Sequence, residues 1–132
     1  PPEIFAVGDT NHATLFSLCA GVAHHGGCGT THTAARAGVP QFIMPQIADQ
    51  FFWGHRIYTL GLGPAAVPPR RITAGKLARA LSEMMENRAF TENAQAIGEE
   101  MKYEDGIPGI VDIVTGRGTG TELAVGVGGA NA

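Results

Sequence analysis

Short apolar runs, each stopped by glycine or proline, alternate along this chain with longer segments of helical periodicity. The runs are residues 4–7, 21–24 and 42–44, and Gly8, Gly26 and Pro45 mark their ends. Runs this short and this uniformly apolar are typical of strands that are buried on both faces of a parallel sheet. Strands that alternate with helices predict an α/β domain.

The helical segments are expected at residues 30–37, 50–60, 74–86, 89–102 and 107–114. In the third of them Leu77, Leu81 and Met84 form one apolar stripe, and Thr73 stands before it as an N-cap. The fold class expected from this order is α/β, a Rossmann-like parallel sheet flanked by helices. Only three or four strands can be found, fewer than a doubly wound domain carries, so the sheet is expected to be incomplete.

The length of 132 residues fits one domain, expected over residues 1–115. Residues 116–132 hold six glycines and no sustained period, which predicts a flexible tail. The net charge of −3, with no basic cluster beyond Arg70-Arg71, argues against nucleic acid as a partner. No apolar run approaches the roughly 18 residues of a membrane span, so a soluble protein is expected.

The two cysteines, Cys19 and Cys28, flank a segment that reads as extended. Their Cα atoms are therefore expected to lie farther apart than the ~7 Å that a disulfide tolerates. Free thiols indicate a cytoplasmic protein. The chain starts without the basic and apolar regions of a signal peptide, as a segment from within a longer gene product would.

The segment with the most chemical content runs from Ala23 to Thr31, where a predicted strand ends and a predicted helix begins. Free N–H groups and the helix dipole favour an anion at such a place, and glycines let it approach the backbone closely. Thr30 adds a hydroxyl, and His25 stands at the carboxyl end of the strand, where an imidazole could meet a phosphate oxygen. Phosphate binding is one interpretation of this turn.

Two other interpretations of the turn stay open. The glycines could serve only a tight strand-to-helix connection, with His25 as an ordinary polar residue. A zinc site is the other, because four residues of the types that bind zinc lie within nine positions, namely His24, His25, Cys28 and His32. No second Cys/His pair with such spacing follows downstream, and there is neither a P-loop motif nor a nucleophile elbow.

Asp49 and Gln50 follow the third apolar run and open the next helix, so they are expected on the same sheet edge as His25. A carboxylate beside a carboxamide offers acceptors and donors that suit vicinal sugar hydroxyls. The alternative is that Asp49 simply caps the helix. The two sites, in either case, should be neighbours.

Four motifs in this order and spacing, with Asp49 standing 24 positions after His25, resemble the donor-binding half of inverting GT-B glycosyltransferases. They are His24-His25-Gly26-Gly27-x-Gly29-Thr30-Thr31, Ala37-Gly38-Val39-Pro40, Asp49-Gln50-Phe51-Phe52-Trp53-Gly54 and Leu60-Gly61-Leu62-Gly63. The chain looks most similar to bacterial and fungal sterol-type glucosyltransferases and to transferases of antibiotic and glycolipid biosynthesis. The resemblance covers residues 4–115 and includes Glu104-Asp105-Gly106 before the last helix.

The resemblance implies a role for each candidate residue. His25, Gly27, Cys28, Gly29 and Thr30 would hold the donor diphosphate, Asp49 and Gln50 would bind sugar hydroxyls, and Thr10 would touch the nucleoside. The donor would be a UDP-sugar or dTDP-sugar. No metal or other cofactor is expected, because the chain has no D-x-D triplet to hold a divalent ion against the diphosphate.

The implied reaction is transfer of a hexose, with inversion, to a hydroxyl of a lipid, sterol or natural product. In the family, an N-terminal domain binds the acceptor and supplies the catalytic base, and the first strands of the donor domain precede the region matched here. The catalytic base is therefore not assigned in this chain, which alone is expected to be inactive. Two alternatives remain: a non-catalytic nucleotide-binding or phosphate-binding module, and a small zinc-binding interaction domain.

Overall fold

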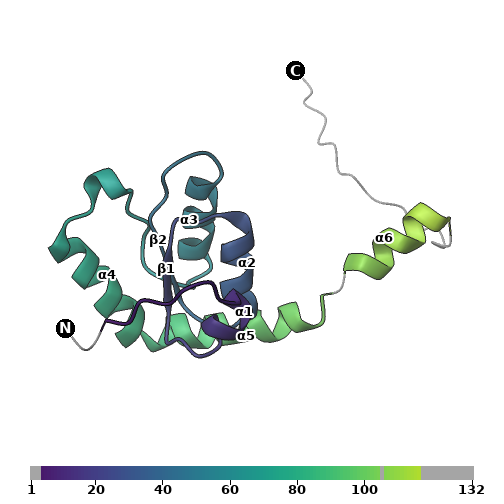
Figure 1. The fold of residues 1–132 in the computed structure, drawn as a ribbon, viewed down its shortest axis with the longest axis horizontal. Helices are drawn as coiled ribbons and strands as arrows, with labels where there is room; N and C mark the ends of the chain where they lie inside the picture. The colour runs from purple at the N-terminus through teal and green to yellow at the C-terminus, as the bar shows by residue number, and fades with distance from the viewer. Residues whose placement is uncertain (1–3, 105, 117–132) are drawn as a thin grey trace, which may run out of the picture.

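The computed structural model describes residues 4–104 and 106–116 (Figure 1). Its elements, in chain order, are α1 (His12–Phe16), β1 (Val22–His24), α2 (Cys28–Arg36), β2 (Gln41–Ile43), α3 (Gln50–Thr59), the 3-10 helix η1 (Pro69–Arg71), α4 (Ala74–Glu86), α5 (Arg88–Lys102) and α6 (Gly106–Thr115).

The two strands are parallel and adjacent, with Val22 opposite Gln41 and His24 opposite Ile43. Helix α2 connects them, which makes a β-α-β unit. The chain beyond α3 continues the pairing on the open side of β2, since Val67 donates its N–H to the Ile43 carbonyl at 3.1 Å. The predicted α/β class is confirmed.

The side chains of β2 point alternately to the two faces of the sheet, and each face has its own helices. Phe42 packs in a buried cluster with Ala80 and Met84 of α4. Ile43 packs in a second cluster with Ile57 of α3 and Ala94 of α5. Figure 1 shows α4 on one side of the strands and α2 and α3 on the other, which is the layered arrangement of a parallel sheet.

The helices lie where their periodicity predicts them, with ends shifted by two residues at most. Helix α4 begins after Thr73, whose hydroxyl oxygen accepts the Lys76 N–H at 3.3 Å as an N-cap. Phe90 and Ala94, on the predicted stripe of α5, are buried. Amphipathic spacing is therefore sufficient to locate these helices.

The strand predicted over residues 4–7 is wrong. That segment has no regular structure, and its side chains face solvent: Ile4 is 76% exposed and Phe5 is 85% exposed. A strand forms only beside a partner, and in the described residues β1 pairs with β2 alone. The apolar composition of residues 4–7 indicates that the segment tends to be buried, but it does not show whether a neighbouring strand is present to pair with it.

Helix α1, which the sequence did not predict, follows this exposed segment. Asn11 caps it, since its side-chain oxygen accepts the N–H groups of Ala13 at 2.9 Å and Thr14 at 3.3 Å. The helix buries Phe16, which joins Val22 of β1 and Ala34 of α2 in a third cluster. Five residues are too few to show a helical period, so only the cap could have indicated it.

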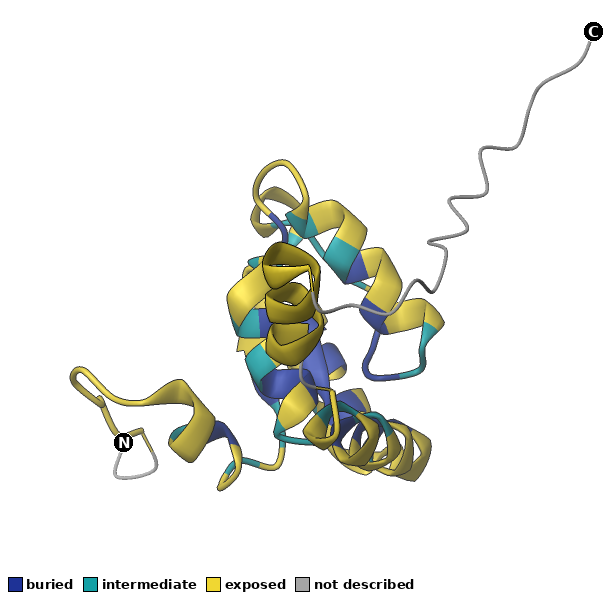
Figure 2. Cartoon of the chain, turned by 90° about the vertical axis from the view of Figure 1, so that its right-hand side faces the viewer, coloured by how far each residue is buried: buried dark blue, intermediate teal, exposed yellow. Residues whose placement is uncertain are grey.

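Helix α6 forms over the predicted C-terminal stripe, yet it lies away from the other elements and exposes its apolar residues (Figures 1 and 2). The predicted tail lies outside the described residues from 117 onward. Cys19 and Cys28 are free thiols, as predicted. None of the helices in the described ranges is both long and apolar enough to cross a membrane.

Candidate donor-binding site

Strand β1 ends at His24, His25 follows it directly, and the structure gives the two histidines different surroundings. His24 is half-buried, its Nε2 lies 2.9 Å from the Gln41 side-chain oxygen, and its Nδ1 accepts the Gly26 N–H at 3.1 Å. This pairing requires the neutral tautomer with hydrogen on Nε2. Both ring nitrogens of His24 are thus used within the fold.

Gln41 extends this arrangement into the core. It is fully buried, and its amide donates to the Thr31 carbonyl at 3.2 Å while its oxygen faces His24. Through these two hydrogen bonds Gln41 of β2 connects His24 of β1 to Thr31 of α2, below the turn at residues 25–27. Sequence analysis missed Gln41, although a polar residue beside the apolar run 42–44 was the available signal.

Burial lowers the pKa of His24 below its usual value of 6.5, the Gln41 hydrogen bond opposes this effect, and His25 lowers the pKa further. Because the pKa is lower in the folded state, protonation favours unfolding.

We expect the free energy of unfolding to be highest above pH 6.5 and to fall as the pH drops toward the folded-state pKa of His24. Thermal melts between pH 7.5 and 5 would show this loss, and His24→Gln should flatten it. If the melting temperature of His24→Gln falls with pH as steeply as that of the unaltered chain, His24 is not the source of the loss of stability.

His25, in contrast, is exposed, and its ring lies over the start of α2. A Cβ placed on Gly27 would lie 2.5 Å from His25 Nε2, so glycine is needed for the ring to lie there. Gly26 adopts the left-handed backbone region, with φ of +89°, which turns the chain from β1 toward α2. The predicted placement of His25 beside a helix N-terminus is confirmed.

Helix α2 begins without a side-chain cap. Its N-cap is Gly27, and the first intrahelical bonds leave the N–H groups of Cys28, Gly29 and Thr30 unpaired. A Cβ on Gly29 would meet no atom within 4 Å, so the approach to these groups is open. Within the described part of the chain the Thr30 hydroxyl has no partner, whereas Thr31 bonds the Gly27 carbonyl. This end of the helix can accept an anion.

Asp49 immediately precedes α3, but it does not cap that helix. Its backbone is already helical, and its side chain makes no bond to the first-turn N–H groups. Instead Asp49 Oδ2 accepts the indole N–H of Trp53 at 3.2 Å. The helix-cap alternative is thereby excluded as the role of this side chain, and its second oxygen has no hydrogen-bond partner in the described part of the chain.

Gln50 stabilises the loop that it follows. Its side-chain oxygen accepts the N–H groups of Gln46 at 2.8 Å and Ile47 at 3.1 Å, beside Ala48 with its positive φ of 48°. Of the two polar atoms of the Gln50 side chain, the amide nitrogen is the one with no partner among residues 4–104 and 106–116. Gln50 therefore has a structural function that the sequence did not indicate.

The two predicted sites are neighbours. A Cβ on Gly26 would lie 3.1 Å from the Gln50 carbonyl oxygen, so the turn after β1 touches the start of α3. The rings of His32 on α2 and Trp53 on α3 pack edge to face with centroids 4.8 Å apart. Thr10 lies in the exposed segment before α1, outside this cluster.

The zinc alternative finds no support in these positions. Among residues 4–104 and 106–116, no three His, Cys, Asp or Glu side chains could hold a metal ion together. His24 is engaged by Gln41, and His32 Nδ1 lies 2.8 Å from the Cys28 carbonyl and 3.5 Å from its sulfur.

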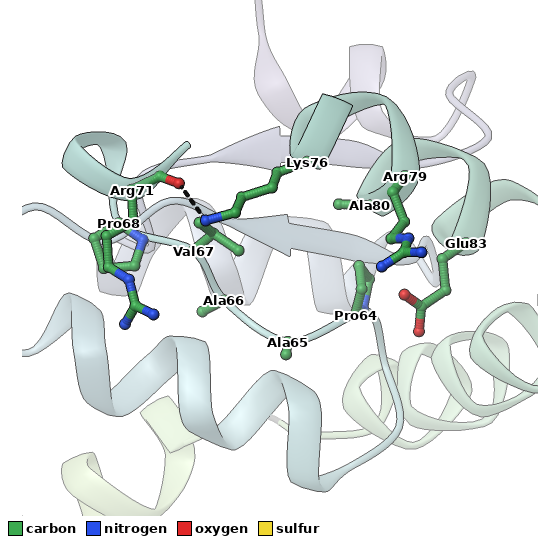
Figure 3. Close-up of a pocket in the computed structure, with 10 residues that line it drawn as sticks. All are labelled: Pro64, Ala65, Ala66, Val67, Pro68, Arg71, Lys76, Arg79, Ala80 and Glu83. Carbon is green, nitrogen blue, oxygen red and sulfur yellow. Dashed lines mark hydrogen bonds between the residues drawn. The ribbon is translucent and has the colours of Figure 1, made fainter. Parts of the chain in front are cut away.

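A separate groove of about 360 Å³ lies between α4 and the segment that starts at Pro64. Figure 3 shows Lys76, Arg79 and Glu83 of α4 along one wall, with the Lys76 ammonium bonded to the Arg71 carbonyl at 2.9 Å. None of the predicted site residues lines it. The candidate site is instead the open edge formed by the starts of α2 and α3.

Residues 1–115 match the family described as "Erythromycin biosynthesis protein CIII-like, C-terminal domain". A sterol 3-beta-glucosyltransferase of Arabidopsis thaliana is 39% identical over 112 residues, which are 85% of this chain and 18% of that protein. Vancomycin aglycone glucosyltransferase of Amycolatopsis orientalis is 46% identical over 90 residues, 66% of this chain and 22% of that protein. The chain thus spans less than a quarter of either relative.

Solved structures agree with these sequences. The crystal structure of the glycosyltransferase VinC in complex with dTDP superposes with a TM-score of 0.76 at 29% identity, and covers 89% of this chain and 30% of that one. The family match over residues 1–115 and an identity of 39% over 85% of the chain show that this chain is homologous to these transferases. The chain belongs to the family of erythromycin biosynthesis protein CIII-like C-terminal domains, the C-terminal domain of GT-B glycosyltransferases.

Proposed function

We propose that this chain is the donor-binding part of a glycosyltransferase that transfers a hexose, with inversion, from a nucleoside-diphosphate sugar to a hydroxyl of a sterol, lipid or natural product. One observation carries the proposal: His25 lies over the uncapped N-terminus of α2, and the turn that follows His25 touches the start of α3, which Asp49 directly precedes. The start of α2 with His25 suits a diphosphate, and the start of α3 with Asp49 suits a sugar. Donor domain and tail would divide at residue 115.

The diphosphate would bind at the start of α2. The N–H groups of Cys28, Gly29 and Thr30 point outward there, the Thr30 hydroxyl adds a donor, and the helix dipole favours negative charge. The His25 imidazole would donate to a phosphate oxygen, while Gly27 keeps the space beneath the ring. These groups need no metal ion to balance the diphosphate, so we propose a metal-independent reaction.

The sugar would be recognised by the start of α3. Asp49 has one oxygen on Trp53 and the other available to hydroxyl donors, and Gln50 can donate from its amide nitrogen. Gln50 adjoins the turn at Gly26 and Asp49 precedes Gln50 in the chain, so a hexose linked to the diphosphate would reach this segment. Thr10 would contact the nucleoside, which requires the segment before α1 to approach the site.

In the reaction, the residues of this chain stabilise the leaving group. As the bond between the anomeric carbon and the diphosphate oxygen breaks, negative charge grows on that oxygen, where the α2 N–H groups and His25 donate hydrogen bonds. The base that deprotonates the acceptor hydroxyl, and the pocket for the acceptor, would come from a preceding domain. The relatives' names, a sterol glucosyltransferase and a vancomycin aglycone glucosyltransferase, support a sterol or natural-product acceptor, and the free thiols support a cytoplasmic location.

Asp49→Ala tests the sugar assignment. Plain UDP has no hexose hydroxyls, so we expect about tenfold weaker binding of UDP-glucose, near 1.4 kcal/mol, and unchanged binding of UDP. Calorimetric titration of both ligands measures this difference. Asp112→Ala, which removes an exposed carboxylate on α6, is the matched control and should leave both affinities unchanged. Equal losses for UDP and UDP-glucose in Asp49→Ala would refute the assignment.

A further inference from the structure

Trp53 is the one tryptophan of the chain, and it lies on α3 one turn after Asp49. Its indole nitrogen donates to Asp49 Oδ2 at 3.2 Å. Its ring contacts His32 edge to face at 4.8 Å and stands at 78° to the Phe52 ring at 5.1 Å. Among the described residues, the Trp53 side chain thus makes one hydrogen bond, and its acceptor is a proposed sugar-binding carboxylate.

The hydrogen bond limits the freedom of an exposed side chain. Asp49 makes no capping bond, so without the indole its carboxylate would rotate between several rotamers. With Oδ2 held by Trp53, the remaining oxygen keeps one direction relative to α3. A ligand then finds the acceptor already oriented and does not lose that rotational freedom on binding.

The Trp53 ring also contacts α2, the helix whose N-terminus is the proposed diphosphate site. His32, against which the indole packs, lies one turn after Cys28, and its Nδ1 is 2.8 Å from the Cys28 carbonyl. Cys28 is the first residue of α2. The indole therefore fixes Asp49 to α3 and also braces α3 against the helix whose N-terminus would bind the phosphates.

We infer that Trp53 is a positioning residue: its indole N–H orients the Asp49 carboxylate toward the sugar of the bound donor. This inference rests on the proposed function. It extends that function because this positioning role is exerted on the sugar through the Asp49 carboxylate and requires no direct contact between Trp53 and the donor. A substitution can separate these two roles of Trp53. Phenylalanine retains most of the ring packing but lacks the N–H that bonds Asp49.

Trp53→Phe in the full 132-residue chain is the deciding variant. Loss of the orienting hydrogen bond should weaken UDP-glucose binding about three- to tenfold and leave UDP binding and the melting temperature unchanged. Phe52→Leu changes the neighbouring ring, which has no polar group, and is the matched control with both affinities retained. In an Asp49→Ala background, Trp53→Phe should have no additional effect on UDP-glucose.

The outcomes separate this inference from the function on which it rests. If Asp49→Ala weakens UDP-glucose selectively and Trp53→Phe does not, the positioning role is wrong and the sugar site stands. If Asp49→Ala shows no selectivity, the proposed sugar site itself fails. If Trp53→Phe weakens both ligands and lowers the melting temperature, Trp53 is only a packing residue.

Fluorescence gives a readout that is independent of ligand. Because Trp53 is the single tryptophan, the emission of the chain reports the surroundings of this indole. Asp49→Ala removes the acceptor of its N–H and should shift the emission maximum, whereas Asp112→Ala should not. An emission spectrum unaffected by Asp49→Ala would mean that the Trp53–Asp49 bond does not persist in solution, and the inference would fall.

Discussion

His25→Ala is expected to weaken UDP binding about 10- to 150-fold, which corresponds to about 1.5–3 kcal/mol for a hydrogen bond to a charged group. The reason is the position of the ring over the start of α2, where Gly27 leaves room for it. The helix N-terminus would remain, so binding should be weakened and not abolished. Because both UDP and UDP-glucose contain the diphosphate, the two affinities should fall together.

That common loss distinguishes His25→Ala from Asp49→Ala, which should affect UDP-glucose alone. His55→Ala is the matched control, since His55 is an exposed histidine on α3. Calorimetry on the three variants with both ligands measures the whole pattern. If His25→Ala binds UDP as tightly as the unaltered chain does, the diphosphate assignment is incorrect.

Gly63→Ala should have the largest effect on stability, with a loss of more than about 3 kcal/mol in the free energy of unfolding. Gly63 passes so close to β2 that a Cβ would overlap the backbone carbonyl oxygen of Gln41. A backbone oxygen cannot move aside as a flexible side chain can. The neighbouring bond from the Gln41 N–H to the Leu62 carbonyl, 2.9 Å long, would also be disturbed.

Gly75→Ala is the control for this prediction. It lies in the first turn of α4, where a Cβ would meet no atom within 4 Å, so stability should stay the same or rise by up to about 1 kcal/mol. Urea unfolding of both variants compares them directly. A Gly63→Ala chain as stable as Gly75→Ala would show that the segment after α3 does not lie against β2 as described.

Much of the fold follows from local pattern. Helices α3, α4 and α5 have apolar residues at helical spacing, and this spacing reflects which side of each helix must be buried. The strands at Val22 and Phe42 were predictable from short apolar runs, although only β2 is buried along its whole length and Ala23 of β1 is exposed. Residues 4–7 have the same composition, yet they form no strand, because pairing depends on a neighbour that a local pattern does not contain.

The position of the site was predictable for a related reason. Parallel strands bring their carboxyl ends to one edge, so the segments after β1 and after β2 had to lie close together. The contact of Gly26 with the start of α3 confirms that expectation. Glycines at the start of a helix likewise indicated that its first backbone N–H groups are accessible to an anion.

Linear spacing was enough to define the α/β class, the main helices and the edge where the two candidate segments meet. It could not assign individual functional groups, because two adjacent histidines or a carboxylate beside a carboxamide look alike until distant residues are placed around them. Buried Gln41 makes His24 structural and leaves His25 exposed, and a loop backbone occupies the oxygen of Gln50. A hydrogen bond depends on distance and direction in space, so only tertiary packing decides which polar groups are satisfied within the fold and which remain available to a ligand.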